Sequence, residues 1–243
     1  MAITQEKGLV VRRVRIRGLD ALHRDGKRTF IYLPCGPNYH VEVAQAVHEA
    51  KLSFPLMDEN VSLIYSAWQN PDKEYSARVI ETLRNYFVLA TNGLLYLPKK
   101  EGEDVHNGVL IDDNFDVRKL KDLNKNREKL LEYKSSLITK LNENDPEVRF
   151  VPFGYPTGEV DNLSNHSLVR GLAGEYGSVK LDEVASKYKE KYRLNTYIAS
   201  FDGVVTEYLS CSALNSKWFG IGLFFRGKFL DDVRVCCAFG VQR

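Results

Sequence analysis

The C-terminal segment WFGIGLFFRGKFLDDVRVCCAFGVQR, residues 218–243, constrains the fold most, because its pattern fits neither a helix nor a one-sided strand. Apolar residues follow one another without interruption at 223–225 and again at 235–237. In a strand, successive side chains point to opposite faces, so every second residue of such a run has to point outward. Those outward residues are either covered by another element or exposed as a binding patch.

The rest of the chain alternates between helical and strand patterns. Apolar residues recur at helical spacing over 40–52, 72–90, 116–141, 167–176 and 181–192. Strands are expected over 9–16, 29–33, 61–68, 93–98, 108–111, 148–153 and 195–201, and shorter, glycine-broken ones over 204–209, 220–225, 228–230 and 233–239. Because helices come first and a mostly antiparallel tail follows, this order predicts an α+β fold rather than a parallel doubly wound sheet.

Length and composition are those of one folded domain. A chain of 243 residues can bury a sizeable core without disulfide bonds or metals. No internal repeat and no low-complexity linker divides it, so we expect a single domain over 1–243. The net charge of +2 is too small to indicate a polyanionic partner, and an apolar share of 44% names no function by itself.

Targeting signals and disulfide bonds are not expected. No stretch reaches the roughly 18–20 apolar residues that a membrane helix needs, and residues 1–18 lack an apolar core between their charges. A cytoplasmic location is therefore the default, while display on a surface or a virion stays open. Four cysteines are too few for a disulfide framework, and the neighbours Cys236 and Cys237 would strain a bridge, so we expect reduced thiols.

One catalytic hypothesis places a nucleophile at Cys35 and a base at His40. Both residues lie where a strand over 29–33 passes into a helix that begins at His40. A thiol near a helix N-terminus has a lowered pKa, and a nearby histidine can take its proton. No oxyanion-hole motif or third group accompanies the pair, and Pro37 removes a backbone donor, so a thiol-dependent enzyme is kept as an alternative only.

A second alternative is nucleic-acid binding through a basic N-terminal strand. Its cations alternate with valines and isoleucine, and they could contact phosphates. Charges on an edge strand also prevent strand-to-strand aggregation, and acidic residues elsewhere almost cancel them, so no nucleic-acid partner is expected. The residues concerned are Arg12, Arg13, Arg15, Arg17, Arg24, Lys27 and Arg28.

No metal or cofactor site is predicted. The histidines form no ligand spacing typical of zinc, and the glycines of GYPTGE and RGLAGEYG lack the spacing of a phosphate loop. Asp112 and Asp113 are adjacent on an expected strand, as are Asp231 and Asp232, so the two carboxylates of each pair point to opposite faces. No carboxylate cluster is dense enough to predict calcium.

Several motifs resemble a known family. The chain is similar to the archaeal variable proteins of diversity-generating retroelements, of the variable protein A type, over about residues 90–243. The motifs include GLLYLPK and HNGVLIDDN upstream. The other matching segments are FVPFGYPTGE (Phe150–Glu159), LVRGLAGEYGSVKLDEVASKY (Leu168–Tyr188), YIASFDGV (Tyr197–Val204), SAL (Ser212–Leu214) and AFGV (Ala238–Val241).

The resemblance implies a C-type lectin fold and a binding function. In such scaffolds the N- and C-terminal strands pair, two helices brace them, and a small, twisted, mainly antiparallel sheet displays a C-terminal variable region, here about residues 205–241. A template RNA is reverse transcribed with errors at adenines, and the mutated copy replaces the coding segment. The implied protein is no enzyme and needs no cofactor; its partner would be a protein or a cell-surface component.

The amino acids of the tail agree with this mechanism. AAY codons become NNY, and NNY never encodes Lys, Trp, Met, Gln or Glu. Between Cys211 and Val241 there is no Met, Gln or Glu, and the residues outside the NNY set are Lys217, Trp218 and Lys228. These three would be fixed positions.

The resemblance also divides the tail into fixed and ligand-facing positions. Fixed positions by the family pattern are Ser212, Ala213, Leu214, Ala238, Phe239, Gly240 and Val241, and Gly220, Gly222 and Gly227 would set turns. Exposed aromatic side chains suit a surface selected for binding. We predict that the variable, ligand-facing positions are Asn215, Phe219, Ile221, Leu223, Phe224, Phe225, Arg226, Phe229, Leu230, Val233, Val235, Cys236 and Cys237.

Overall fold

The computed structural model describes residues 18–23, 26–31, 34–201, 203–216, 222–224 and 236–242. The expected strands over 9–16 and 228–230 lie outside these ranges. So do eight of the predicted ligand-facing positions: Phe219, Ile221, Phe225, Arg226, Phe229, Leu230, Val233 and Val235.

The centre of the molecule is a mixed sheet that comprises nine strands in the described part of the chain. Its pairings are antiparallel except for β10 with β8 and β11 with β4. The α+β fold class and the mainly antiparallel pairing are confirmed, but a sheet of this size is not small. In spatial order the strands are β3 (Cys35–Asn38), β11 (Cys236–Ala238), β4 (Phe87–Leu97), β9 (Tyr208–Asn215), β10 (Gly222–Phe224), β8 (Thr196–Ala199) and β7 (Gly158–Val160). In addition, β5 (Gly108–Asp112) pairs with β4, and β6 (Val148–Pro152) pairs with β5.

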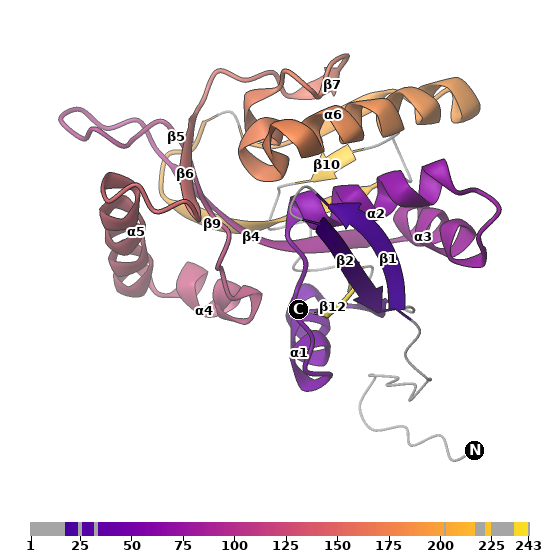
Figure 1. The fold of residues 1–243 in the computed structure, drawn as a ribbon. Coiled ribbons are helices and arrows are strands. Elements are labelled where there is room, and N and C mark those ends of the chain that lie inside the picture. The colour runs from indigo at the N-terminus through magenta and orange to yellow at the C-terminus, as the bar shows by residue number, and fades with distance from the viewer. Residues whose placement is uncertain are drawn as a thin grey trace.

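Strand β4 holds the sheet together because it pairs with three others (Figure 1). One edge runs along β9, from Val88 opposite Leu214 to Tyr96 opposite Tyr208. The other edge is divided: its first residues pair with β11, and residues from Gly93 onward pair with β5. The register with β9 shifts between Leu89 and Gly93, and the sheet branches at this irregularity.

A second sheet joins the two ends of the described chain. It is formed by β1 (Gly18–His23), β2 (Gly26–Ile31) and β12 (Val241–Gln242). Val241 lies opposite Phe30 in an antiparallel pair, and both side chains are fully buried. The N-terminal and C-terminal strands therefore pair directly (Figure 1).

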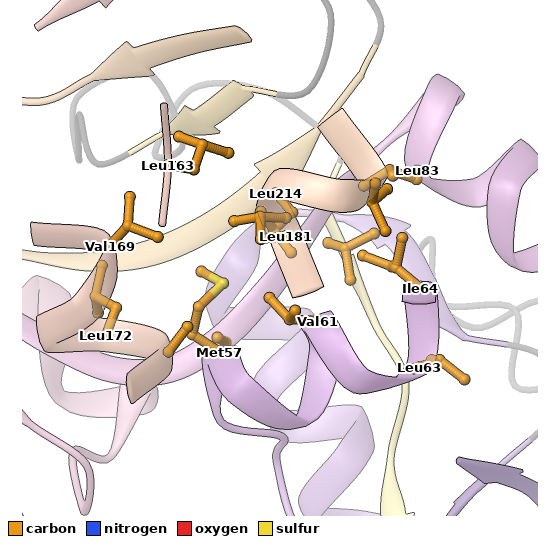
Figure 2. Packing of buried hydrophobic residues seen from close by; sticks show 14 of the residues in the cluster. Met57, Val61, Leu63, Ile64, Leu83, Leu163, Val169, Leu172, Leu181 and Leu214 are labelled. Carbon is orange, nitrogen blue, oxygen red and sulfur yellow. The ribbon is translucent and has the colours of Figure 1, made fainter. Parts of the chain in front are cut away.

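Helices cover both faces of the central sheet (Figure 1). Along β4 the side chains alternate: Val88, Leu94 and Tyr96 belong to one apolar cluster, and Leu89 and Leu95 belong to the other. The first cluster includes residues of α2 (Met57–Gln69), α3 (Glu74–Asn85) and α6 (Ser167–Tyr192), as Figure 2 shows. The second includes residues of α1 (His40–Glu49), the 3-10 turn Val117–Lys119, α4 (Leu120–Lys125) and α5 (Arg127–Asn142).

Three local predictions were wrong. Residues 61–68 belong to helix α2, in which every residue from 57 to 64 is buried, and a stretch buried on all sides shows no clear strand or helix period. The two helices expected over 167–176 and 181–192 form the single helix α6, whose break lies at Gly174, with a φ of 67°. The helix over 72–90 ends at Asn85, since the next residues enter β4.

Glu207, just before β9, forms ion pairs with α5 and with the β4–β5 connection. Its side chain is fully buried and pairs with Arg127 of α5, with Lys134 Nζ at 3.4 Å, and with Lys100 Nζ of the β4–β5 connection at 3.3 Å. Burial by itself raises the pKa of this carboxyl group, but the bonds from Arg127 and Lys100 outweigh burial and lower it to about 2. The ionised form is therefore stabilised by folding.

We predict a pH-dependent loss of stability for Glu207→Gln. Because the folded-state pKa lies below the ordinary 4.5, the carboxylate's contribution is complete above about 4.5 and is lost as pH falls towards about 2. At neutral pH the variant should unfold with about 2 kcal/mol less free energy, and the deficit should shrink as the solution is acidified. Urea unfolding at several pH values measures this. Glu101→Gln, an exposed position in the same connection, is the matched control; an equal deficit in both variants would contradict the prediction.

Candidate ligand-binding site

The predicted variable segment leaves the sheet at Asn215 and Ser216, and both residues are held by the end of α3. Asn215 Nδ2 donates a 2.8 Å hydrogen bond to the carbonyl oxygen of Tyr86. The Ser216 amide donates to the carbonyl oxygen of Leu83 at 2.9 Å, and its hydroxyl lies 3.3 Å from the Tyr188 hydroxyl of α6. The start of the segment is thus fixed against two helices.

The segment returns beside the same place. Cys236 pairs with Phe87 and Cys237 with Val88, at the beginning of β4. On its other edge β11 pairs with β3, where Cys236 lies opposite Asn38. The two flanks of residues 217–235, at Ser216 and Cys236, therefore both lie at the junction of α3 and β4, and both flanks are buried.

Three predicted ligand-facing positions are wrong. Asn215, Cys236 and Cys237 are at most 2% exposed. Because helices cover both faces of the sheet, Cys236 belongs to one apolar cluster and Cys237 to the other. The adjacent cysteines are thus framework rather than surface. The backbone of Leu223 and Phe224 lies in β10, between β9 and β8.

The framework positions lie in the core. Ser212, Ala213 and Leu214 are buried in β9, and all of 238–241 is buried at the end of the chain. Gly240 lies so close to Leu52 that a Cβ atom there would come within 2.4 Å of its side chain. Any side chain other than glycine at this position would displace Leu52.

A hollow lies next to the fixed start of the segment. It is about 510 Å³ in volume and is lined by the end of α2, by α3 and by the end of α6. Trp68 and Tyr192 are in its wall, and both rings contact Tyr188, which also meets Ser216. These residues were not predicted as a site, because Trp68 was expected in a strand and lies in helix α2. The signal available was the clustering of Tyr188, Lys191 and Tyr192 on one amphipathic helix.

The Cys35 and His40 hypothesis loses its physical motive. Cys35 opens β3 opposite Ala238, and partial burial raises the pKa of its thiol, which is the opposite of the shift that an activated nucleophile needs. Burial also raises the pKa of Cys237 well above its ordinary value. The four cysteines are all free thiols.

The basic-strand hypothesis can be assessed at one residue in detail. Arg28 of β2 donates from Nε to the buried carboxylate of Glu59 at 3.2 Å, so this cation stabilises the contact of the sheet with α2. Lys27 is exposed in the same strand. Arg12, Arg13, Arg15, Arg17 and Arg24 lie outside the described residues.

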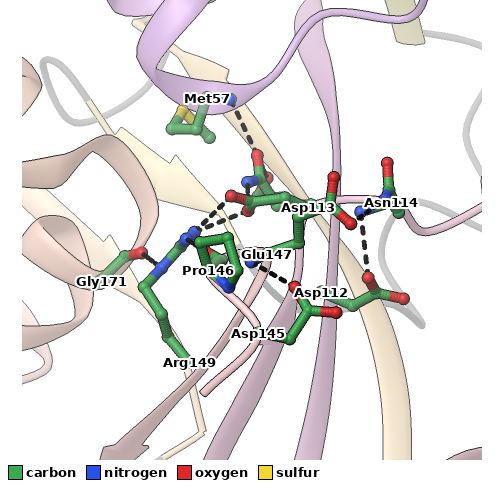
Figure 3. A network of polar contacts seen from close by, with 11 residues as sticks. Met57, Asp112, Asp113, Asn114, Asp145, Pro146, Glu147, Arg149 and Gly171 are labelled. Atoms are coloured by element: carbon green, nitrogen blue, oxygen red, sulfur yellow. Dashed lines mark hydrogen bonds and ion pairs between the residues drawn. The ribbon is translucent and has the colours of Figure 1, made fainter. Parts of the chain in front are cut away.

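The carboxylates of Asp112, the last residue of β5, and of Asp113, which follows it, have separate partners. Asp112 accepts a 2.6 Å bond from the Tyr133 hydroxyl, whose pKa is raised by burial and by this carboxylate. Asp113 accepts bonds from Arg149 Nη2 at 2.6 and 2.8 Å and from Asn92 Nδ2 at 2.6 Å (Figure 3). The pair is a structural network rather than a shared acid–base site.

Comparison with protein-family models, with curated proteins and with solved structures finds no match to this chain. Within the described ranges, no three histidine, cysteine, aspartate or glutamate side chains are grouped so that they could hold a metal ion. None of the described helices combines the length and the apolar character that crossing a membrane requires.

Proposed function

We propose that the protein is a ligand-binding scaffold of the C-type lectin type whose C-terminal segment is a hypervariable surface diversified by a retroelement. The whole chain is one domain in this proposal, and the ligand is a protein or a cell-surface component. Binding, rather than catalysis, is its activity.

The proposal rests on one observation: both residue pairs that flank 217–235 are fixed in the core. These flanks, Asn215–Ser216 and Cys236–Cys237, are buried and bonded to neighbouring residues between Leu83 and Val88. A segment whose two flanks are fixed in the core, and whose residues Gly222–Phe224 pair with β9 and β8, can change the side chains that do not face the core without loosening the fold, as antibody loops do on a rigid sandwich. The irregular pattern of the tail is compatible with such a role.

Two further features support the scaffold. The N- and C-terminal strands pair through Phe30 and Val241, as the family resemblance implies. The NNY-compatible composition between Cys211 and Val241 fits diversification at adenines. The nine-stranded sheet and the six helices of the described ranges are larger than the small scaffold implied by the resemblance, so the proposal concerns the type of architecture rather than its size.

The proposal predicts that tail substitutions spare stability while substitutions in the flanks do not. Phe224→Asp combined with Phe229→Ser should change the free energy of unfolding by no more than about 1 kcal/mol, as surface substitutions do. Cys237→Asp, the matched flank variant, should lose about 3 kcal/mol or more because it buries an unpaired polar group. Chemical denaturation measures both. A loss of several kcal/mol in the tail variant would place its residues in the core and sink the assignment.

The source of variation has its own test. Sequencing the DNA around the coding region should reveal a reverse-transcriptase gene and a near-copy of the last coding stretch that differs only at adenines. A locus with neither feature would remove the retroelement from the proposal, whereas the stability comparison would still judge the display surface.

A further inference from the structure

The hollow between α2, α3 and α6 combines aromatic walls with cations. Trp68, Ile80 and Tyr192 supply apolar surface, and Arg84 and Lys191 supply charge. Its volume of about 510 Å³ is that of sites which bind small organic molecules, where mostly apolar walls carry a few charged groups.

The two cations lie over the aromatic rings of the hollow. Arg84 Cζ lies 5.0 Å from the centre of the Tyr192 ring, and Lys191 Nζ lies 5.4 Å from the ring centres of both Trp68 and Tyr192. Within the part of the chain that the structure describes, neither cation makes an ion pair with a carboxylate. Two adjacent unneutralised cations favour an anionic occupant.

The single carboxylate in the lining does not cancel this charge. Glu81 Oε2 lies 3.4 Å from Arg78 Nη1, one turn earlier on α3, so its nearest cation is outside the lining. Both side chains are about 60% exposed, so solvent screens their mutual attraction. Glu81 therefore lies towards solvent.

The aromatic wall is held in a fixed orientation. Trp68 packs edge-on against Tyr188 with ring centres 5.0 Å apart, and Tyr192 packs on Tyr188 at 5.2 Å. Tyr188 is buried and is tied to the sheet through Ser216. Rings fixed in this way offer apolar contact at a low entropic cost of ordering.

We propose that the hollow binds an organic anion that carries a flat apolar ring, with a carboxylate or phosphate group near Arg84 and Lys191 and the ring against Trp68 and Ile80. None of the described residues of the predicted variable segment lines the hollow, and the proposal does not rest on the proposed function. The lining residues lie outside the predicted variable positions, so the hollow would be a constant site next to a variable one.

Fluorescence of Trp68 tests the proposal. The chain has two tryptophans, so a Trp218→Phe background makes Trp68 the only indole. Phenylphosphate and phenylacetate should each change its emission in a saturable way at millimolar concentration, whereas benzylamine, of opposite charge, and inorganic phosphate, without a ring, should not. The anion with the lower Kd tells whether the natural group is a phosphate or a carboxylate.

Charge-neutralising variants locate the site. Arg84→Gln and Lys191→Gln should each raise Kd about tenfold, because each removes a charge-assisted contact. Lys187→Gln makes the same charge change one turn earlier on α6, beside Tyr65 and outside the hollow, and should leave Kd within about twofold. Since Arg84 and Lys191 are exposed, both variants should fold.

Several results would overturn the proposal. They are the absence of a saturable response to both anions, a response to benzylamine as strong as that to phenylacetate, a response to inorganic phosphate as strong as that to phenylphosphate, and an equal Kd in the Arg84, Lys191 and Lys187 variants. The display function is judged separately, by the stability of the tail and flank variants and by the neighbouring DNA.

Discussion

Replacing Arg149 by methionine should lower the free energy of unfolding by about 3 kcal/mol at neutral pH, because it leaves the mostly buried carboxylate of Asp113 without its cation. Arg149 donates two bonds to Asp113, one to the carbonyl oxygen of Gly171 at 2.7 Å and one to that of Pro146 at 3.1 Å. A single side chain thus connects β5, β6 and α6 (Figure 3). Denaturant unfolding gives the loss directly.

Arg170→Met is the matched control, since Arg170 is half exposed and its guanidinium lies 3.8 Å from the exposed Glu175. Its loss should stay within about 0.5 kcal/mol. If the free energy of unfolding falls equally in both methionine variants, the Arg149 network adds nothing to stability.

The pH dependence of the Arg149→Met variant follows from Asp113. Burial raises the pKa of this carboxyl group, and Arg149 acts in the opposite direction, so removing Arg149 should raise the folded-state pKa further. A carboxyl group whose folded pKa lies above its unfolded value binds more protons in the native state, and stability then falls as pH rises through that window. The deficit should therefore be smaller at about pH 4 than at neutral pH. The double variant with Asp113→Asn should lose this pH dependence.

Replacing Gly36 by alanine should lower the free energy of unfolding by about 3 kcal/mol, because the residue has a left-handed φ of 113° and almost touches β11. A Cβ atom there would lie 2.5 Å from the carbonyl oxygen of Cys236 and 3.1 Å from Cys237 Cα. Backbone has to move to relieve such a contact. The strand that would shift is the one to which the variable segment returns.

Gly154→Ala separates the two causes of this loss. Gly154 has nearly the same φ, 110°, but a Cβ atom there would meet nothing within 4 Å. The free energy of unfolding of Gly154→Ala should fall only by the cost of the backbone strain, about 1 kcal/mol. The difference between the two alanine variants measures the contact with β11, and equal losses would mean that this contact is relieved without cost.

The local sequence pattern predicted the position of an element correctly where one face of that element is apolar. Helix α1 begins at His40 as expected, β5, β6 and β8 lie where their short apolar runs are, and the long helical region of 116–141 is broken only near Asn126. Each of these signals depends on residues a few positions apart, which the sequence contains in full.

Local pattern failed where an element is buried on all sides. Residues 61–68 were given to a strand and form a helix, and the adjacent apolar residues at 236–237 were given to a surface and lie in a strand covered on both faces. In both cases burial on more than one side removes the period that distinguishes inward from outward residues. The candidate hollow was missed because Trp68, near the end of α2, was assigned to the strand expected over 61–68.

The sequence by itself determined which segments are helical or extended over most of the described chain, that these segments build an α+β fold, and that the apolar run at 235–237 needs a cover or a partner. Only the tertiary structure decided that helices on both sides provide this cover for Cys236 and Cys237, that β4 joins two branches of one sheet, and that the flanks of 217–235 meet beside α3. The physical reason is distance along the chain. Periodicity is a property of neighbouring residues, whereas strand pairing and burial depend on contacts between residues such as Tyr86 and Asn215, which lie 129 positions apart.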